Sequence, residues 1–187
     1  MTIIAKTKYV EFKTAKSPSG SDWCYLRRTN DKPNQDSAVV ITTLVKIQNE
    51  YNFLFLKTKR PPLYAENKAQ YCLESPAGLI ADDDCNENLI ECTKKELLEE
   101  AGLIANEIYI ELTNSAASAG LTSETLSYVT AIVENYNIIK QPVSDGGIIV
   151  ERFLVPAKDI KRYFSEKNEM SLASATVCGV FFALNRF

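Results

Sequence analysis

The sequence predicts an α/β (α+β) sandwich, with helices on both faces of a mixed sheet and an N-terminal antiparallel β appendage. Strand-like segments come first, followed by one amphipathic helix, more strands and two C-terminal helices. A length of 187 residues suits one domain with an appendage. We therefore expect an appendage over residues 1–36, with roles in dimerisation and substrate contact, and a main domain over residues 37–187.

In the first half of the chain, segments rich in β-branched and aromatic residues alternate with turn signals. The predicted strands are residues 9–12, 23–28, 37–48, 51–57 and 71–73. The Ser/Pro/Gly-rich stretch 17–21 separates the first two strands, and Asn49-Glu50 joins the next pair as a hairpin. Residues 76–84 are predicted to form a loop.

The second half begins with the amphipathic helix. A capping box of Asp84 with Glu87 predicts its start, and the helix is expected to run to about Ala101. The Ser/Ala/Gly-rich stretch 114–123 is a predicted loop. The remaining elements are predicted strands at 107–112, 127–134 and 148–155, and helices at 157–163 and 172–184.

Composition excludes several classes of function. The net charge of −3 argues against nucleic-acid binding. Because the chain has no His, imidazole-based zinc sites and His-dependent catalysis are excluded. Five scattered Cys residues without a Cys-x-x-Cys pair indicate reduced thiols. With no visible signal peptide and no run of about 18 apolar residues, we expect a cytoplasmic protein without a membrane partner.

The most informative stretch holds Glu96, Glu99 and Glu100. On a helix these carboxylates fall within about 100° of arc. They also precede Gly102, a natural helix end, where acids repel one another and oppose the negative end of the helix dipole. A sequence selected only for helix stability would place Lys or Arg there. The arrangement therefore indicates a positive partner, most simply a hard divalent cation.

This stretch resembles the Nudix box of the Nudix hydrolase superfamily, which reads Gly, five residues, Glu, seven residues, then Arg-Glu-apolar-x-Glu-Glu-x-Gly-apolar. Glu87 stands eight residues before Lys95, as the box requires, and residues 96–103 match it throughout. Gly78 lies three residues too early, so residues 82–84 look like an insertion. Lys95 replaces the usual Arg, which keeps the charge but loses the planar fork. The resemblance implies the three-layer Nudix sandwich.

Two more segments resemble the ADP-ribose and nucleoside-diphosphate-sugar pyrophosphatase branch. Residues 74–78 look like its Glu-x-Pro-Ala-Gly motif, and residues 118–124 look like its Ser-Pro-Gly-x-(Ser/Thr)-x-Glu loop, with Ala119 in place of Pro. That difference keeps other nucleoside-diphosphate sugars open as substrates. In this branch the N-terminal segment crosses to a partner subunit, which implies a homodimer. The residues that resemble its substrate-binding positions are Trp23, Arg28 and Arg60.

The resemblance also implies roles at the site. Glu96, Glu100 and the backbone carbonyl of Ala77 would bind Mg²⁺, with Mn²⁺ as an alternative, and Glu99 would bind the ion or orient a ligand. Glu124 matches the position that activates water. Glu151 is a rival for that role.

The function implied is Mg²⁺-dependent hydrolysis of a nucleoside diphosphate sugar, ADP-ribose or similar, to a nucleoside monophosphate and a sugar phosphate. Two alternatives stay open. One is a non-catalytic nucleotide-sugar sensor, which Lys95 and the lengthened loop would favour. The other is a Nudix pyrophosphatase that sanitises nucleoside triphosphates, which shares the box, whereas the Glu-x-Pro-Ala-Gly motif and the long N-terminus argue against it.

Overall fold

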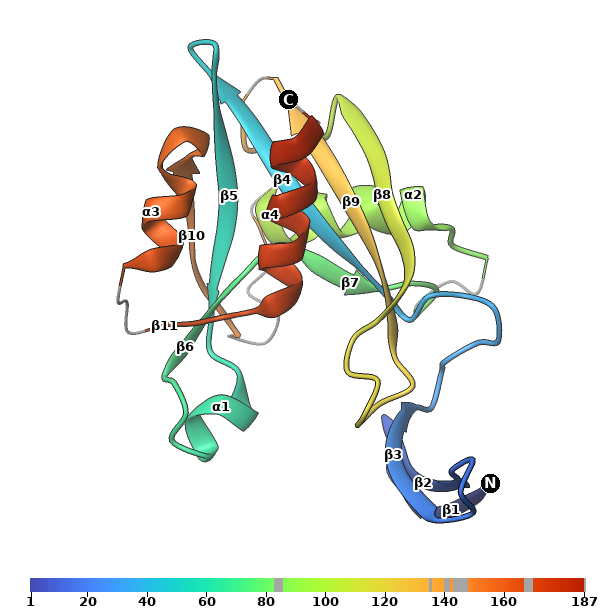
Figure 1. The fold of residues 1–187 in the computed structure, drawn as a ribbon. Coiled ribbons are helices and arrows are strands. Elements are labelled where there is room, and N and C mark those ends of the chain that lie inside the picture. Colours follow the sequence, from blue (N-terminus) through green and yellow to red (C-terminus); the bar gives the residue numbers. More distant parts are fainter. Residues whose placement is uncertain (83–85, 135, 140–141, 143–147, 167–169, 187) are drawn as a thin grey trace.

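The structure is a computed structural model that describes residues 1–82, 86–134, 136–139, 142, 148–166 and 170–186 (Figure 1). Its order of strands and helices follows the predicted one closely. In chain order the elements are β1 (Thr2–Lys6), β2 (Val10–Lys16), β3 (Asp22–Arg28), β4 (Ala38–Ile47), β5 (Glu50–Thr58), α1 (Pro61–Ala65), β6 (Tyr71–Glu74), β7 (Ala77–Leu79), α2 (Leu89–Glu96), a π-helical turn (Leu97–Ala101), β8 (Glu107–Ala116), β9 (Thr125–Val133), β10 (Ile149–Pro156), a 3₁₀ turn (Ala157–Asp159), α3 (Ile160–Ser165), β11 (Met170–Leu172) and α4 (Ser174–Arg186).

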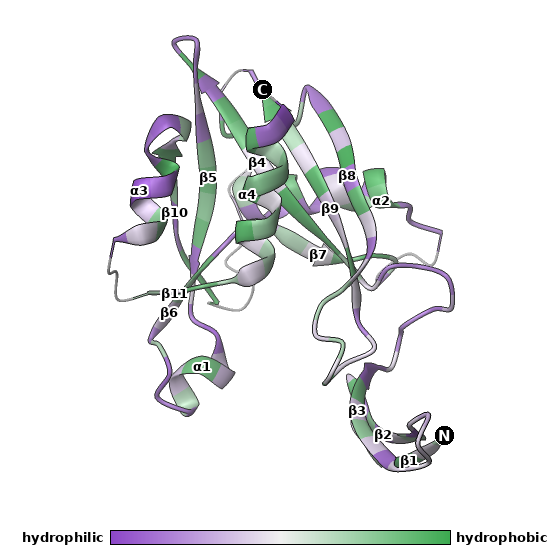
Figure 2. Ribbon diagram, viewed as in Figure 1, coloured by the Kyte–Doolittle hydropathy of each residue, from purple (hydrophilic) through white to green (hydrophobic). Residues whose placement is uncertain are grey.

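Within the described residues, eight strands form one mixed sheet in the order β11-β6-β5-β4-β9-β8, with β10 beside β5 and β7 beside β4. Strand β4 runs parallel to β9 and antiparallel to β5. Its first eight residues are buried, as expected for a central strand covered on both faces, and Figure 2 shows its hydrophobic colouring. The predicted mixed sheet is therefore confirmed.

The hairpin of β4 and β5 opens toward one end of the sheet. The two strands pair with each other only near their turn, from Thr43 with Leu54 to Ile47 with Glu50. Beyond that point β6 pairs with β5, and β7 pairs with the start of β4. The short segment between β6 and β7 therefore lies where the two central strands separate, and this placement builds one wall of the pocket described below.

Two hydrophobic cores lie on opposite faces of the sheet. On one face, Cys92 of α2 and Leu97 of the π-helical turn pack with sheet residues such as Ile41. On the other face, Ile160 of α3 and Val180 of α4 pack with a second set of sheet residues. The structure is thus the predicted α/β/α sandwich.

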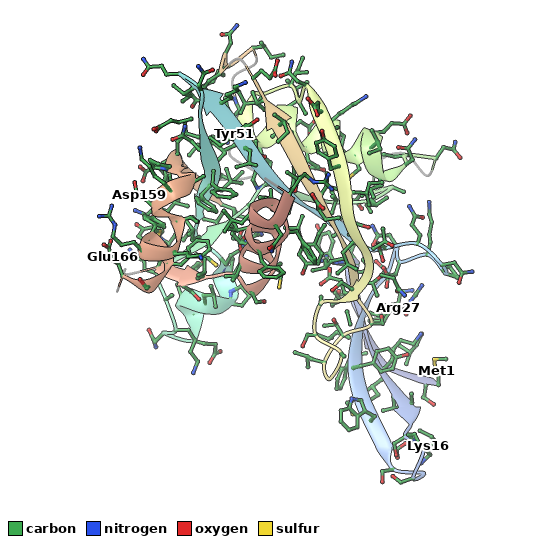
Figure 3. All side chains as sticks on the ribbon, turned by 45° about the horizontal axis from the view of Figure 1, so that its top comes forward. Met1, Lys16, Arg27, Tyr51, Asp159 and Glu166 are labelled. Atoms are coloured by element: carbon green, nitrogen blue, oxygen red, sulfur yellow. The ribbon has the colours of Figure 1, made fainter. Side chains whose placement is uncertain are left out.

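The first three strands form a separate antiparallel sheet in the order β1-β2-β3. Figures 1 and 3 show this sheet, the appendage, projecting from the main domain. Backbone hydrogen bonds tie it to the loop before β9, because Leu26 N donates to Leu121 O and Ser123 N donates to Leu26 O. The appendage therefore holds the segment that leads to Glu124.

Several predicted boundaries were wrong. The helix begins at Leu89, where Asn88 and Glu91 form the capping box, rather than at Asp84, which lies outside the described residues. Strand β7 occupies part of the predicted loop 76–84, and β8 continues past the predicted strand end into the next loop. Three further elements, β1, α1 and β11, were not predicted from the sequence. These are short elements, and tertiary contacts rather than local preference decide whether such segments become ordered.

In the described part of the chain, no helix has the length and apolar character needed to cross a membrane.

Candidate active site

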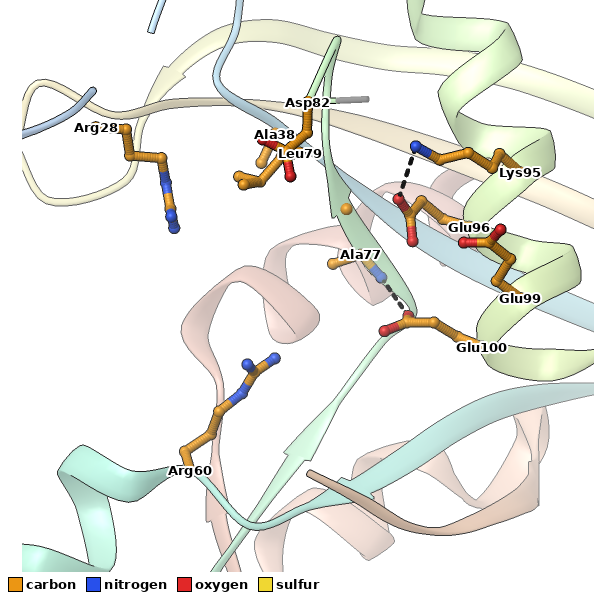
Figure 4. Close-up of a pocket in the computed structure, with 11 residues that line it drawn as sticks. Arg28, Ala38, Arg60, Ala77, Leu79, Asp82, Lys95, Glu96, Glu99 and Glu100 are labelled. Carbon is orange, nitrogen blue, oxygen red and sulfur yellow. Dashed lines mark hydrogen bonds and ion pairs between the residues drawn. The ribbon is translucent and has the colours of Figure 1, made fainter. Parts of the chain in front are cut away.

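A pocket of about 610 Å³ lies between the helix that carries the acidic residues, the β6–β7 segment and two arginines (Figure 4). Figure 4 shows the three carboxylates of the helix on one side, with Arg28 and Arg60 across from them. The pocket is lined by Arg28, Ala38, Arg60, Ala77, Gly78, Leu79, Asp82, Lys95, Glu96, Glu99 and Glu100. Six of the eight residues predicted for the site therefore line one cavity.

The local structure of the helix explains why its acids face the pocket. Asn88 caps the start, because its side chain accepts hydrogen bonds from Ile90 N and Glu91 N. The last turn is π-helical, a form that recurs at functional sites, and its buried residues Leu97 and Ala101 fix the opposite face in the core. Gly102 ends it with φ of 70°, as predicted.

The side chain of Glu96 is largely shielded, with 15% exposed. Burial raises its pKa to about 7, against the opposing pull of Lys95, and the nearby Glu99 and Glu87 carboxylates raise it further. Its carboxyl group lies against Gly78, where any added Cβ would overlap it. The glycine of the β6–β7 segment is thus needed for the close approach of this carboxylate.

Lys95 bridges two acids. Its Nζ lies 3.3 Å from Glu87 Oε1 and 3.6 Å from Glu96 Oε1. The other oxygen of Glu87 accepts a hydrogen bond from Ala81 N, at 3.1 Å. Although Lys lacks the planar fork of Arg, it reaches both neighbouring carboxylates here.

The β6–β7 segment is anchored at every step. Ser75 N donates to Thr176 Oγ1 of α4 at 2.8 Å, and Ile41 N donates to Pro76 O at 2.8 Å. Ala77 N donates to Glu100 Oε2 at 2.9 Å, which joins the segment to the acidic helix. Hydrogen bonds of the segment's backbone to side chains and to β4 therefore position Ala77 beside the carboxylates.

The site suits a hard divalent cation, because four carboxylate residues line the pocket and the chain has no His. A bound cation would also relieve the like-charge repulsion from Glu99 and Glu87 that helps to raise the pKa of Glu96. Among the described residues, however, no three His, Cys, Asp or Glu side chains already converge on one point. Binding an ion would require the glutamate side chains to rotate toward each other.

Each arginine at the pocket is paired with an acid. Arg28 Nε donates to Glu124 Oε1 at 2.6 Å. Arg60 donates to Glu74 through both Nε and Nη2, at distances of 2.8 to 3.1 Å. Both side chains are partly exposed, so each pair lies at the rim rather than in the core.

The other predicted residues lie outside the described lining of the pocket. Trp23 is 53% exposed, and its indole Nε1 donates to Gly120 O at 3.1 Å. Glu124 contacts Arg28, which lines the pocket. Glu151 lies on β10 with its side chain 57% exposed and 3.8 Å from Lys57. Glu74 was not predicted as the partner of Arg60, although the Glu-x-Pro-Ala-Gly motif contains it.

Comparison with known proteins places this arrangement in context. No protein-family model matches the chain. It is 28% identical over 166 residues to the mouse (Mus musculus) protein ADP-sugar pyrophosphatase. The aligned region covers 84% of this chain and 72% of that protein. The structure resembles an ADP compounds hydrolase, with a TM-score of 0.60, 17% identity and coverage of 99% of this chain and 90% of that one.

A second similar structure is the NUDIX domain of Shewanella oneidensis NrtR complexed with ADP ribose, with a TM-score of 0.57 and 17% identity. It covers 84% of this chain and 94% of that one. The chain therefore has the fold of these solved structures, which is the Nudix fold that its box predicts. Its similarity to an ADP-sugar pyrophosphatase agrees with the resemblance to that branch.

Proposed function

We propose that this protein is a hydrolase that cleaves the pyrophosphate of a nucleoside diphosphate sugar, ADP-ribose or similar, with the help of Mg²⁺. The observation that carries the proposal is the single pocket in which Glu96, Glu99 and Glu100 face Arg28 and Arg60. Acids on one wall and guanidinium groups on the other suit a ligand whose diphosphate bridges a metal ion and an arginine.

In this proposal Glu96, Glu100 and the carbonyl oxygen of Ala77 hold the ion, and Glu99 binds it or orients a ligand. The ion would neutralise charge on the diphosphate and lower the pKa of a bound water. Arg28 and Arg60 bind phosphate oxygens, and Lys95 keeps Glu87 and Glu96 in place. Trp23 offers an exposed indole face to a nucleobase.

The test is turnover of a substrate panel by the full chain, measured as released monophosphate with Mg²⁺, with Mn²⁺ and with a chelator. We expect metal-dependent cleavage of ADP-ribose or another nucleoside diphosphate sugar to a nucleoside monophosphate and a sugar phosphate. Binding of these compounds without cleavage under every metal condition would favour a sensor. Faster cleavage of nucleoside triphosphates would favour the sanitising activity.

We further propose that Glu124 is the general base and that substrate binding releases it. Phosphate oxygens that attract Arg28 would compete with the Glu124 carboxylate for the same guanidinium. Glu124→Gln is expected to lower kcat by about 100-fold, within the usual range for general-base catalysis, and Glu151→Gln to change it less than about twofold. Steady-state kinetics with ADP-ribose compare the two; the reverse ranking would assign the role to Glu151.

We also propose that residues 1–36 form a dimerisation appendage, so that two copies of the chain associate. This segment has seven basic and four acidic residues, whereas the rest of the chain has 14 and 20. The appendage of one copy is therefore complementary in charge to the main domain of another. It also exposes large apolar side chains, namely Ile3, Ile4, Tyr9, Phe12 and Trp23.

Light scattering after size exclusion should give twice the 20.9 kDa mass of one chain. The double variant Ile3→Asp and Ile4→Asp is expected to shift the protein toward the single-chain mass, because charges at an apolar interface are not compensated. Ile104→Asp, at an exposed position of the main domain, is the matched control. A single-chain mass for the unaltered protein would contradict the dimer.

A further inference from the structure

Arg60 and Glu74 form the most constrained ion pair at the rim of the pocket. Glu74 accepts from Arg60 Nε through both of its oxygens, at 3.1 and 3.0 Å, and from Nη2 at 2.8 Å. A contact of this kind fixes both the position and the plane of a guanidinium group, which a single hydrogen bond does not. The Glu74 side chain is largely shielded, with 16% exposed, against 41% for Arg60.

The backbone on both sides of the pair is also held. Arg60 immediately precedes the two prolines that begin α1, and Leu63 N donates to Arg60 O at 3.0 Å. Glu74 ends β6, where it pairs with Leu56 of β5. Neither residue can move far unless a strand end or a helix start moves with it.

Glu74 also begins the segment that reaches Ala77. Only Ser75 and Pro76 lie between them in the sequence, and hydrogen bonds from Ser75 N to Thr176 and from Ile41 N to Pro76 hold this backbone. The same segment ends on the hydrogen bond from Ala77 N to Glu100. The carboxylate that orients Arg60 is therefore rigidly connected to the acidic side of the pocket.

We propose that Glu74 is a positioning residue that sets Arg60 to bind an anionic ligand, and so determines substrate affinity without touching the substrate. This inference rests on the proposed function of the pocket. An arginine without such a partner samples many rotamers and loses that freedom on binding, whereas an oriented guanidinium binds at a lower entropic cost. Glu74 should therefore affect affinity and KM more than kcat.

The experiment is a double-mutant cycle read out as the Kd of ADP-ribose by calorimetry with a chelator present, together with KM and kcat with Mg²⁺. Glu74→Ala is expected to weaken binding about tenfold and to raise KM in parallel, with kcat changed less than about twofold. Glu74→Gln, which keeps one acceptor oxygen, should lose less. In an Arg60→Ala background, Glu74→Ala should add less than about a twofold effect.

Glu50→Ala is the matched control, because Glu50 forms an exposed ion pair with Lys158 outside the pocket lining. Thermal unfolding checks that each variant folds. If Glu74→Ala has the same effect with and without Arg60, or leaves ADP-ribose binding unchanged or tighter, this inference is wrong while the proposed function stands. Ligand binding with non-additive effects but without hydrolysis would sustain the inference and refute the proposed activity. A wild-type protein that binds neither ADP-ribose nor any other nucleoside diphosphate sugar of the panel would refute both.

Discussion

Glu100→Gln is expected to reduce turnover of ADP-ribose by at least about 100-fold while the protein remains folded. Loss of a residue that merely supports a metal ligand lowers metal affinity or activity roughly 10- to 100-fold, so loss of a proposed ligand should lower activity at least as much. Gln is isosteric but neutral, and it removes charge from the cation site. Its amide oxygen can still accept the hydrogen bond from Ala77 N, so the β6–β7 segment should keep its position.

Steady-state kinetics with Mg²⁺ and a thermal unfolding curve check this expectation. Glu50→Gln removes a carboxylate charge from an exposed pair on β5 and should leave both measurements unchanged. Near-normal turnover of Glu100→Gln would show that this carboxylate does not hold an essential ion. A large fall in unfolding temperature would instead assign Glu100 a structural role through Ala77.

Gly179→Ala in α4 is expected to destabilise the fold by about 1–3 kcal/mol, the usual cost of overpacking a core. Replacing Gly by Ala inside a helix normally gains about 1 kcal/mol, so a destabilising result would be diagnostic. The physical reason is that a Cβ at position 179 would overlap Thr42 Oγ1 of the central strand β4. Both residues are buried, and β4 is paired on both sides.

Chemical denaturation measures this free energy, and Thr42→Ala supplies the control. Thr42 Oγ1 has no hydrogen-bond partner among the described residues, so its removal leaves no donor or acceptor unpaired. In the Thr42→Ala background, Gly179→Ala should not lower the free energy of unfolding, and the higher helix propensity of Ala can raise it. If Gly179→Ala raises stability in the unaltered protein, the close contact between α4 and β4 does not constrain the fold.

The acidic helix was predictable because its signals are local. The spacing of Glu96, Glu99 and Glu100 places them on one face of any helix, and Gly102 supplies a residue that readily adopts positive φ. The start of the same helix was placed wrongly because the sequence offers two capping boxes in succession. Asn88 with Glu91 forms the one seen in the structure, where it leads directly into buried residues of α2.

The pairings at the rim of the pocket were not predictable in the same way. Arg28 and Glu124 are 96 positions apart, and Trp23 and Gly120 are 97 apart, so no local pattern links them. Arg28, Glu124 and Trp23 were predicted as site residues from resemblance. The hydrogen bonds and the ion pair that join the appendage to the loop before β9 at these residues were not predicted.

By itself, the sequence determined the class of fold, the acidic face of the helix and the oxygen-rich chemistry of the site. Those properties depend on residue type and on spacing within a few turns of chain, which the backbone geometry of a helix or strand turns directly into position. Only the tertiary structure decided that Gly78 lies against Glu96 and that Glu74 holds Arg60. Contacts of this kind arise where β4 and β5 separate and admit the β6–β7 segment, because packing between distant segments brings those side chains together.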